Sequence, residues 1–184
     1  MSLAEGVTKS IQNPMLQLED GTAIMERCFF KTIHEGYGFS ISHRFEGVAA
    51  DASTDLYFEN PANSGREVFI IMIEVVSFGQ AYVDIYRGNK IVANGTSLTP
   101  VNLNFEKTIT SVVNAEYGGT YTLGTLTLNT VCPGGYLVRA IGGTAEVGET
   151  AVIPPNFNFI VRATNKSGAA TDLSIRVIWW EQAQ

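Results

Sequence analysis

Short runs of alternating apolar and polar residues, separated by glycine, proline and asparagine, limit most strongly how this chain can fold. The run from Asp172 to Trp180 is the clearest, with large apolar residues at every second position: Leu173, Ile175, Val177 and Trp179. Successive side chains of a β-strand point to opposite faces, so this pattern predicts a strand with one buried face. From Ala23 onward no window shows the 3.6-residue period of an amphipathic helix. We therefore predict an all-β chain.

Turn residues between the runs predict how the strands connect. Tyr82 to Arg87 meets Lys90 to Val92 across Gly88-Asn89, and both of these turn residues accept positive φ, so we predict a β-hairpin there. Pro154-Pro155 predicts a corner before a further strand, because proline cannot donate to a sheet hydrogen bond. The runs together give about eight to ten strands, which predicts an antiparallel β-sandwich that is jelly-roll-like.

The length of the chain predicts one folded domain. At 184 residues the chain can bury a full core once, whereas two domains would each be small. Residues 1–20 are polar and unpatterned and end near the turn pair Asp20-Gly21, so we assign them to an N-terminal arm. Residues 21–184 form the predicted single β-sandwich domain.

The run from Glu67 to Val76 is unusual because it is apolar on both of its faces. One face can fill the core, whereas the other must be covered by a loop, the N-terminal arm or another subunit. Charged residues make up 16% of the chain, below the roughly 25% of ordinary soluble proteins. We therefore predict a homo-oligomer with this candidate subunit interface: Phe69, Ile71, Ile178 and Trp180. The alternative for Trp180 is packing on a loop of its own subunit.

The charge of the chain predicts which partners it lacks. Its net charge of -6 and pI of about 4.9 argue against nucleic acid, because a phosphate backbone would be repelled. No apolar run is long enough for a membrane span, which needs roughly eighteen residues or more. Residues 1–12 lack the basic and apolar regions of a secretion signal, so we expect a soluble protein made in the cytoplasm.

Residues suited to catalysis or metal binding form no convincing group. Cys28 and Cys132 lack a C-x-x-C neighbour, which predicts buried thiols, with one disulfide between them as the alternative. His34 and His43 are nine residues apart, an odd spacing that would place them on opposite faces of a strand. We therefore predict no catalytic residue, no metal and no cofactor, and expect that the chain is not an enzyme. An unrecognised hydrolase is the third-ranked hypothesis.

Tyrosines suggest a different alternative. Tyr82 and Tyr86 lie on one side of their run, where aromatic rings could stack on sugar rings. A carbohydrate- or surface-binding module is therefore the second hypothesis, with Tyr82 and Tyr86 as candidate glycan contacts. Core and interface positions are commoner roles for such tyrosines.

Three stretches carry a resemblance to a group of known proteins. GTSLTPVNLN, Gly95 to Asn104, resembles a recurrent stretch in small virion-associated proteins of tailed bacteriophages and prophages. YFENPANSG, Tyr57 to Gly65, is similar to their entry from a strand into a turn. VIPPNFNFIVRATNKSGAATDLSIRVIWWE, Val152 to Glu181, is similar to their closing hairpin. The likeness covers about Thr54 to Glu181, whereas Ala23 to Glu46 departs from the group.

The resemblance implies a structural or accessory component of a phage particle, such as a head decoration or fibre-like protein. It implies location in the virion, assembly around an axis as a trimer, and contacts with other virion proteins. No catalytic residues come with it. The sparse charge and the doubly apolar run fit such an assembly independently, because cyclic association buries a surplus apolar face once per subunit.

Overall fold

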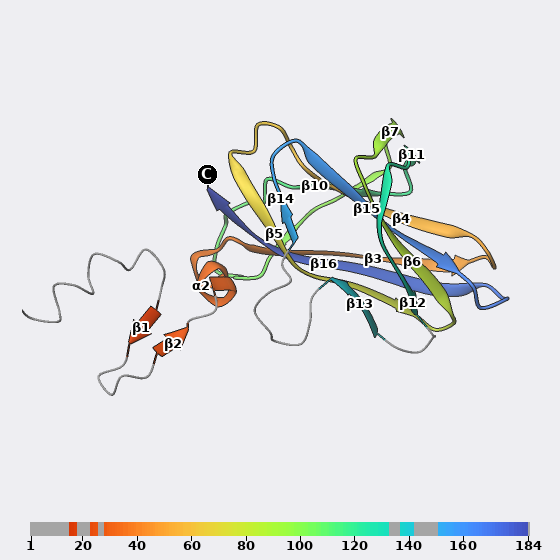
Figure 1. Cartoon of the computed structure of the whole chain (residues 1–184), viewed down its shortest axis with the longest axis horizontal. Coiled ribbons are helices and arrows are strands. Elements are labelled where there is room, and N and C mark those ends of the chain that lie inside the picture. The colour runs from red at the N-terminus through yellow and green to blue at the C-terminus, as the bar shows by residue number, and fades with distance from the viewer. Residues whose placement is uncertain (1–14, 18–22, 26–27, 133–136, 142–150, 184) are drawn as a thin grey trace, which may run out of the picture.

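The alternating runs form strands in the computed structural model, which describes residues 15–17, 23–25, 28–132, 137–141 and 151–183 (Figure 1). Sheet I contains, in spatial order, β12 (Thr125–Cys132), β6 (Ala81–Arg87), β15 (Phe157–Asn165), β4 (Ser53–Asn60), β10 (Asn114–Tyr117) and β8 (Thr96–Leu98). Sheet II contains, in spatial order, β13 (Leu137–Ile141), β5 (Arg66–Ser77), β16 (Thr171–Ala183), β3 (Gly38–Val48) and β9 (Val101–Asn102), with β14 (Ala151–Ile153) also beside β5. The remaining described elements are two strand pairs, β1 (Met15–Gln17) with β2 (Ala23–Met25) and β7 (Lys90–Ala93) with β11 (Thr120–Thr122), and the helix α2 (Cys28–Glu35).

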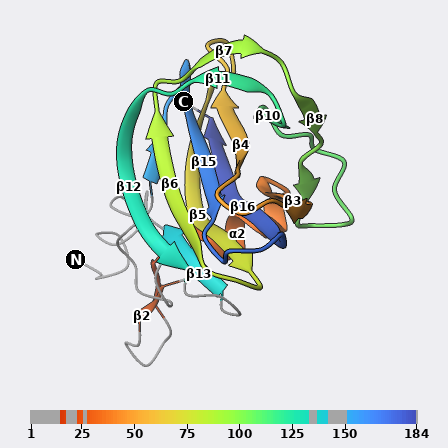
Figure 2. The ribbon, with the colours of Figure 1, turned by 90° about the vertical axis from the view of Figure 1, so that its right-hand side faces the viewer.

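All of the described strand pairs are antiparallel, and the two sheets pack face to face. Figure 2 shows β12, β6, β15 and β4 side by side in sheet I. The structure describes sixteen strands, and these eight have five residues or more: β3, β4, β5, β6, β12, β13, β15 and β16. The all-β antiparallel sandwich is therefore confirmed.

The core lies between the sheets and is filled by the inward positions of the alternating strands. In β16 these are the residues predicted from the period of two, Leu173, Ile175, Val177 and Trp179, and all four are buried. The Trp179 ring stacks 6.0 Å from that of Phe39 and meets the ring of Phe58 edge-on at 5.0 Å. Because Phe39 and Trp179 belong to sheet II and Phe58 to sheet I, this cluster holds the two sheets together.

The corner predicted at Pro154-Pro155 is confirmed. β14 ends at Ile153 and β15 begins at Phe157, so the two prolines lie between strands, where no donor is needed. Asn156 completes the corner with a φ of 63°, a left-handed conformation that asparagine tolerates better than most residues.

The hairpin predicted across Gly88-Asn89 is wrong. β6 pairs with β12 on one side and with β15 on the other, whereas β7 pairs with β11. Gly88 has the expected positive φ of 68°, but Asn89 donates from Nδ2 to the Tyr86 carbonyl and accepts from the Gly124 amide at Oδ1. The turn therefore leads the chain out of sheet I, because both edges of β6 are already occupied.

Helix α2 is a second difference from the sequence prediction, which contained strands alone. It packs against β3 and β16, at the end of sheet II where the chain enters the sandwich. A Cβ on Gly38 would lie only 2.7 Å from Cγ1 of Ile33, so glycine is what allows the helix to lie this close to the sheet.

Two further predictions fall mainly outside the described residues. Within the predicted arm, residues 1–20, only Met15–Gln17 is described, and it pairs with Ala23–Met25. Cys132 is buried at the end of β12, whereas the side chain of Cys28 is outside the described part. A disulfide between them stays a hypothesis.

Candidate functional site

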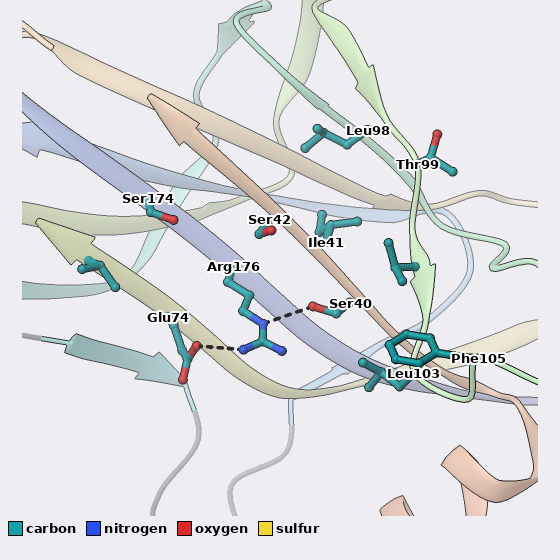
Figure 3. A pocket seen from close by; sticks show the side chains of 12 residues that line it. Ser40, Ile41, Ser42, Glu74, Leu98, Thr99, Leu103, Phe105, Ser174 and Arg176 are labelled. Atoms are coloured by element: carbon teal, nitrogen blue, oxygen red, sulfur yellow. Dashed lines mark hydrogen bonds and ion pairs between the residues drawn. The ribbon is translucent and has the colours of Figure 1, made fainter. Parts of the chain in front are cut away.

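A groove of about 520 Å³ lies on the outer face of sheet II, which points away from the core (Figure 3). Its floor is formed by outward residues of β3, β5 and β16, and its wall by the segment 98–105. The register explains this arrangement, because Arg176 of β16 lies opposite Glu74 of β5 and Ser42 of β3. Residues more than a hundred positions apart in the sequence thus share one surface.

The floor of the groove is polar and carries one cation. The Arg176 guanidinium donates from Nε to Oγ of Ser40 at 3.3 Å, and its Nη1 lies 3.7 Å from Oε2 of Glu74. Figure 3 shows the Arg176 side chain between these two partners. Ser42 and Ser174 complete this part of the floor. The ion pair neutralises the floor, so charge alone would not attract a ligand here.

The wall of the groove is apolar and exposed. Phe105 exposes 87% of its surface, Val101 is also exposed, and Leu103 lies beside Phe105 (Figure 3). Val76 of β5 forms an exposed apolar rim on the other side. Large exposed apolar side chains gathered at one groove are typical of surfaces that contact another macromolecule.

Two asparagines hold the wall in place. Nδ2 of Asn102 donates to the carbonyls of Gly36 and Ile109, at 2.8 and 2.9 Å. Nδ2 of Asn104 donates to the carbonyl of His34 at 3.0 Å, and the Leu103 amide donates to the Gly38 carbonyl. These residues belong to the stretch Gly95 to Asn104 that the sequence analysis singled out, and they fix the position of Val101 and Phe105.

The four residues predicted as a subunit interface also lie on sheet II, beyond one end of the groove. Phe69 and Trp180 face each other across β5 and β16, with rings stacked 4.0 Å apart and almost parallel. Ile178 is buried and Ile71 is half-buried. The chain itself therefore covers part of this surface.

The exposed apolar residues that sequence reasoning missed lie around the groove instead. Phe105 and Val101 were not predicted, although both adjoin or belong to the Gly95–Asn104 stretch. Their exposure depends on the fold of an irregular segment, which has no periodicity that a sequence could reveal.

No protein-family model, curated protein or solved structure matches this chain.

Tyr82 and Tyr86, the candidate glycan contacts, lie on the outer face of sheet I. Tyr82 is exposed and Tyr86 is half-buried. Nζ of Lys166 lies 5.5 Å from the Tyr82 ring centre, and the Arg162 guanidinium lies 6.0 Å from that of Tyr86. Sugar stacking needs an open ring face, so these cation–π contacts make both tyrosines less suitable for it.

Residues suited to metal binding or hydrolysis are not brought together in the described part of the chain. No group of three His, Cys, Asp or Glu side chains there could hold a metal ion. His34 lies in α2, whereas His43 lies in β3 and stacks on Tyr117 at 3.5 Å. Among the described residues, no helix is long and apolar enough to cross a membrane.

The surroundings of His43 indicate that the stability of the fold depends on pH. Burial lowers the pKa of His43 below its ordinary value of 6.5, and its ring is enclosed by Tyr117 and by the edge of Phe45. Below pH 6.5 the unfolded chain therefore binds more protons than the folded one, so stability decreases as the pH falls through this range. We expect the thermal unfolding midpoint of the His43→Phe variant to fall by less than that of the original chain between pH 7.5 and pH 5.5.

The matched control for this measurement is His34→Asn, which removes the exposed histidine of α2. It should keep the pH dependence of the original chain. Equal midpoint losses for the original chain and His43→Phe would contradict the prediction.

Proposed function

We propose that this protein is a non-catalytic structural or accessory component of a phage-like particle, which associates through the outer face of sheet II. The observation that carries the proposal is the apolar wall of the groove, where Phe105, Val101 and Val76 are exposed together. In a monomer this surface stays in water, whereas association would remove it. The sparse charge of the chain supports the same conclusion.

The order of the strands adds support from architecture. Among the eight long strands, the first along the chain lies beside the last, the second beside the seventh, the third beside the sixth and the fourth beside the fifth. These pairs are β3 with β16, β4 with β15, β5 with β13, and β6 with β12. This is the order of a hairpin rolled up into two sheets, and we infer a jelly roll. Viral capsid proteins use this architecture, as do lectin domains. The architecture therefore agrees with the proposal but does not distinguish it from a carbohydrate-binding function.

The resemblance of three stretches to virion-associated proteins gives the proposal its biological setting. It favours three copies around an axis, in contact with other proteins of the particle. The best-defined of these stretches, Gly95 to Asn104, positions the groove wall, so the resemblance and the apolar surface coincide in one segment.

Phe105→Ser tests the proposal. We expect the original chain to form three-fold contacts through the groove and the variant to lose these contacts more readily, because an aromatic side chain that becomes buried at an interface contributes about 2 kcal/mol or more to association. This corresponds to a rise of roughly 30-fold in the dissociation constant. Analytical ultracentrifugation over a range of concentrations measures it.

Phe78→Ser is the matched control, because Phe78 exposes 79% of its surface but lies in the turn after β5 and does not line the groove. It should leave the association unchanged. A monomeric original chain that is also absent, by mass spectrometry, from gradient-purified particles of the cells encoding it would overturn the proposal.

A further inference from the structure

β12 forms an edge of sheet I whose outer side has no strand partner in the described part of the chain. It pairs with β6 alone, and Figure 2 shows it as the outermost strand of the sheet. The strand is eight residues long, or about 27 Å, and six of its eight residues are exposed. Along this length a row of backbone N–H and C=O groups faces away from the sheet.

The edge strands at the other described ends of sheets I and II are short or carry charged residues, unlike β12. β8 has three residues and β9 has two, so neither offers more than a short template. β13 carries Arg139, and the half of β3 that extends beyond β9 carries the exposed pair Arg44 and Glu46. Short length and charge are the usual ways in which proteins prevent association at a sheet edge.

β12 is neither short nor charged, and its pairing with β6 shifts register once, between Leu126 and Leu128. Its sequence, TLTLNTVC, contains no charged residue and no proline. Leu126 and Val131 expose 45% and 50% of their surfaces, and Leu128 is also exposed. A strand with these properties gains both backbone hydrogen bonds and apolar contacts when another strand pairs with it.

We propose that β12 pairs antiparallel with β12 of a second copy of this chain, about a two-fold axis perpendicular to the sheet. Such an axis places β12 of one copy opposite β12 of the other, and because this strand is uncharged, no like charges meet within the strand pair. The pairing also joins the two copies of sheet I into one continuous sheet. The described strands near the N-terminus do not compete for this edge, because β1 and β2 pair with each other. The contact is separate from the groove and does not depend on the proposed function.

Lysine substitutions at the edge test this pairing. Leu126→Lys combined with Val131→Lys places positive charges where the two copies meet, while both positions are exposed in the single chain. We expect the dissociation constant of the two-fold contact to rise at least about tenfold in analytical ultracentrifugation. Val92→Lys on β7, which is even more exposed at 66%, is the control and should leave it unchanged.

Hydrogen exchange of the original chain gives a second readout that does not depend on how the variants fold. The outward amides of residues 125–131 should exchange at least about tenfold more slowly at high than at low protein concentration. If they exchange equally fast at concentrations where the chain is associated, or if the chain stays monomeric, the edge contact is wrong. Association that Phe105→Ser abolishes and the lysine pair leaves intact would likewise overturn the edge contact, while supporting the groove.

Discussion

Glu181→Ala lowers the free energy of unfolding by about 3 to 5 kcal/mol, the expected result for removing one partner from a buried charged network. The Glu181 carboxylate is almost completely buried. Its Oε2 accepts from Nη1 of Arg66 at 2.8 Å, and its Oε1 accepts from the Val112 amide at 3.1 Å and from Nε1 of Trp179 at 3.2 Å. The Ser111 hydroxyl also donates to Oε1. Alanine would leave these donors unpaired, and each unpaired buried group costs about 1 to 3 kcal/mol.

Chemical denaturation followed by fluorescence measures this loss. Glu181→Gln should lie between alanine and the original chain, because it keeps one acceptor oxygen and the shape of the side chain. Glu46→Ala is the control, since Glu46 forms an exposed ion pair with Arg44 and should change stability by less than about 0.5 kcal/mol. A loss below about 1 kcal/mol for Glu181→Ala would show that the network does not stabilise the fold.

Trp179→Ala has an expected effect of similar size, about 3 to 5 kcal/mol, because it opens a cavity in the core. Trp179 is fully buried and contacts Phe39 of its own sheet and Phe58 of the opposite sheet. Trp180→Ala is the matched control in the same strand, because Trp180 is half-buried on the outer face, and it should cost roughly half as much. Equal losses for the two tryptophans would contradict the position of Trp179 at the centre of the core.

The two large effects should not be additive. Trp179 donates to Glu181, so each single variant already removes their hydrogen bond. The double variant Trp179→Ala with Glu181→Ala should therefore lose less than the sum of the single losses, by about 0.5 to 3 kcal/mol. Additive losses would show that the two residues act independently.

Local patterns in the sequence were sufficient to predict several of the long strands and the buried face of the last one, β16. The period of two in β16 identified Leu173 to Trp179 as core, because strand geometry alone decides which side chains share a face. Pro154-Pro155 marked a corner for a reason equally local, the missing N–H of proline.

Pairing between strands could not be predicted in the same way. The Gly88-Asn89 turn looked like a hairpin, but whether β7 can pair with β6 depends on β12 and β15, which are distant in the sequence. Helix α2 was missed because it has only eight residues and contains Cys, Phe, Thr and Ile, which favour helices weakly. Its contacts with β3 and β16, rather than its intrinsic propensity, stabilise it.

The candidate groove was even less accessible from the sequence. The run from Glu67 to Val76 is apolar on both faces, which indicated that its outward side chains needed to be covered. Phe69 is indeed partly covered, because its ring stacks on that of Trp180. The exposed surface lies elsewhere, on an irregular segment whose course is set by the hydrogen bonds of Asn102 and Asn104. Such bonds join positions about seventy residues apart, so no local signal reports them.

Asn102 and Asn104 fasten the groove wall to the carbonyls of Gly36 and His34, at the end of α2. Side-chain amides thus couple the groove wall to this helix end, so a displacement of the helix end would also displace Val101 and Phe105. The position of the proposed contact surface is therefore set partly by the end of a helix that does not itself line the groove.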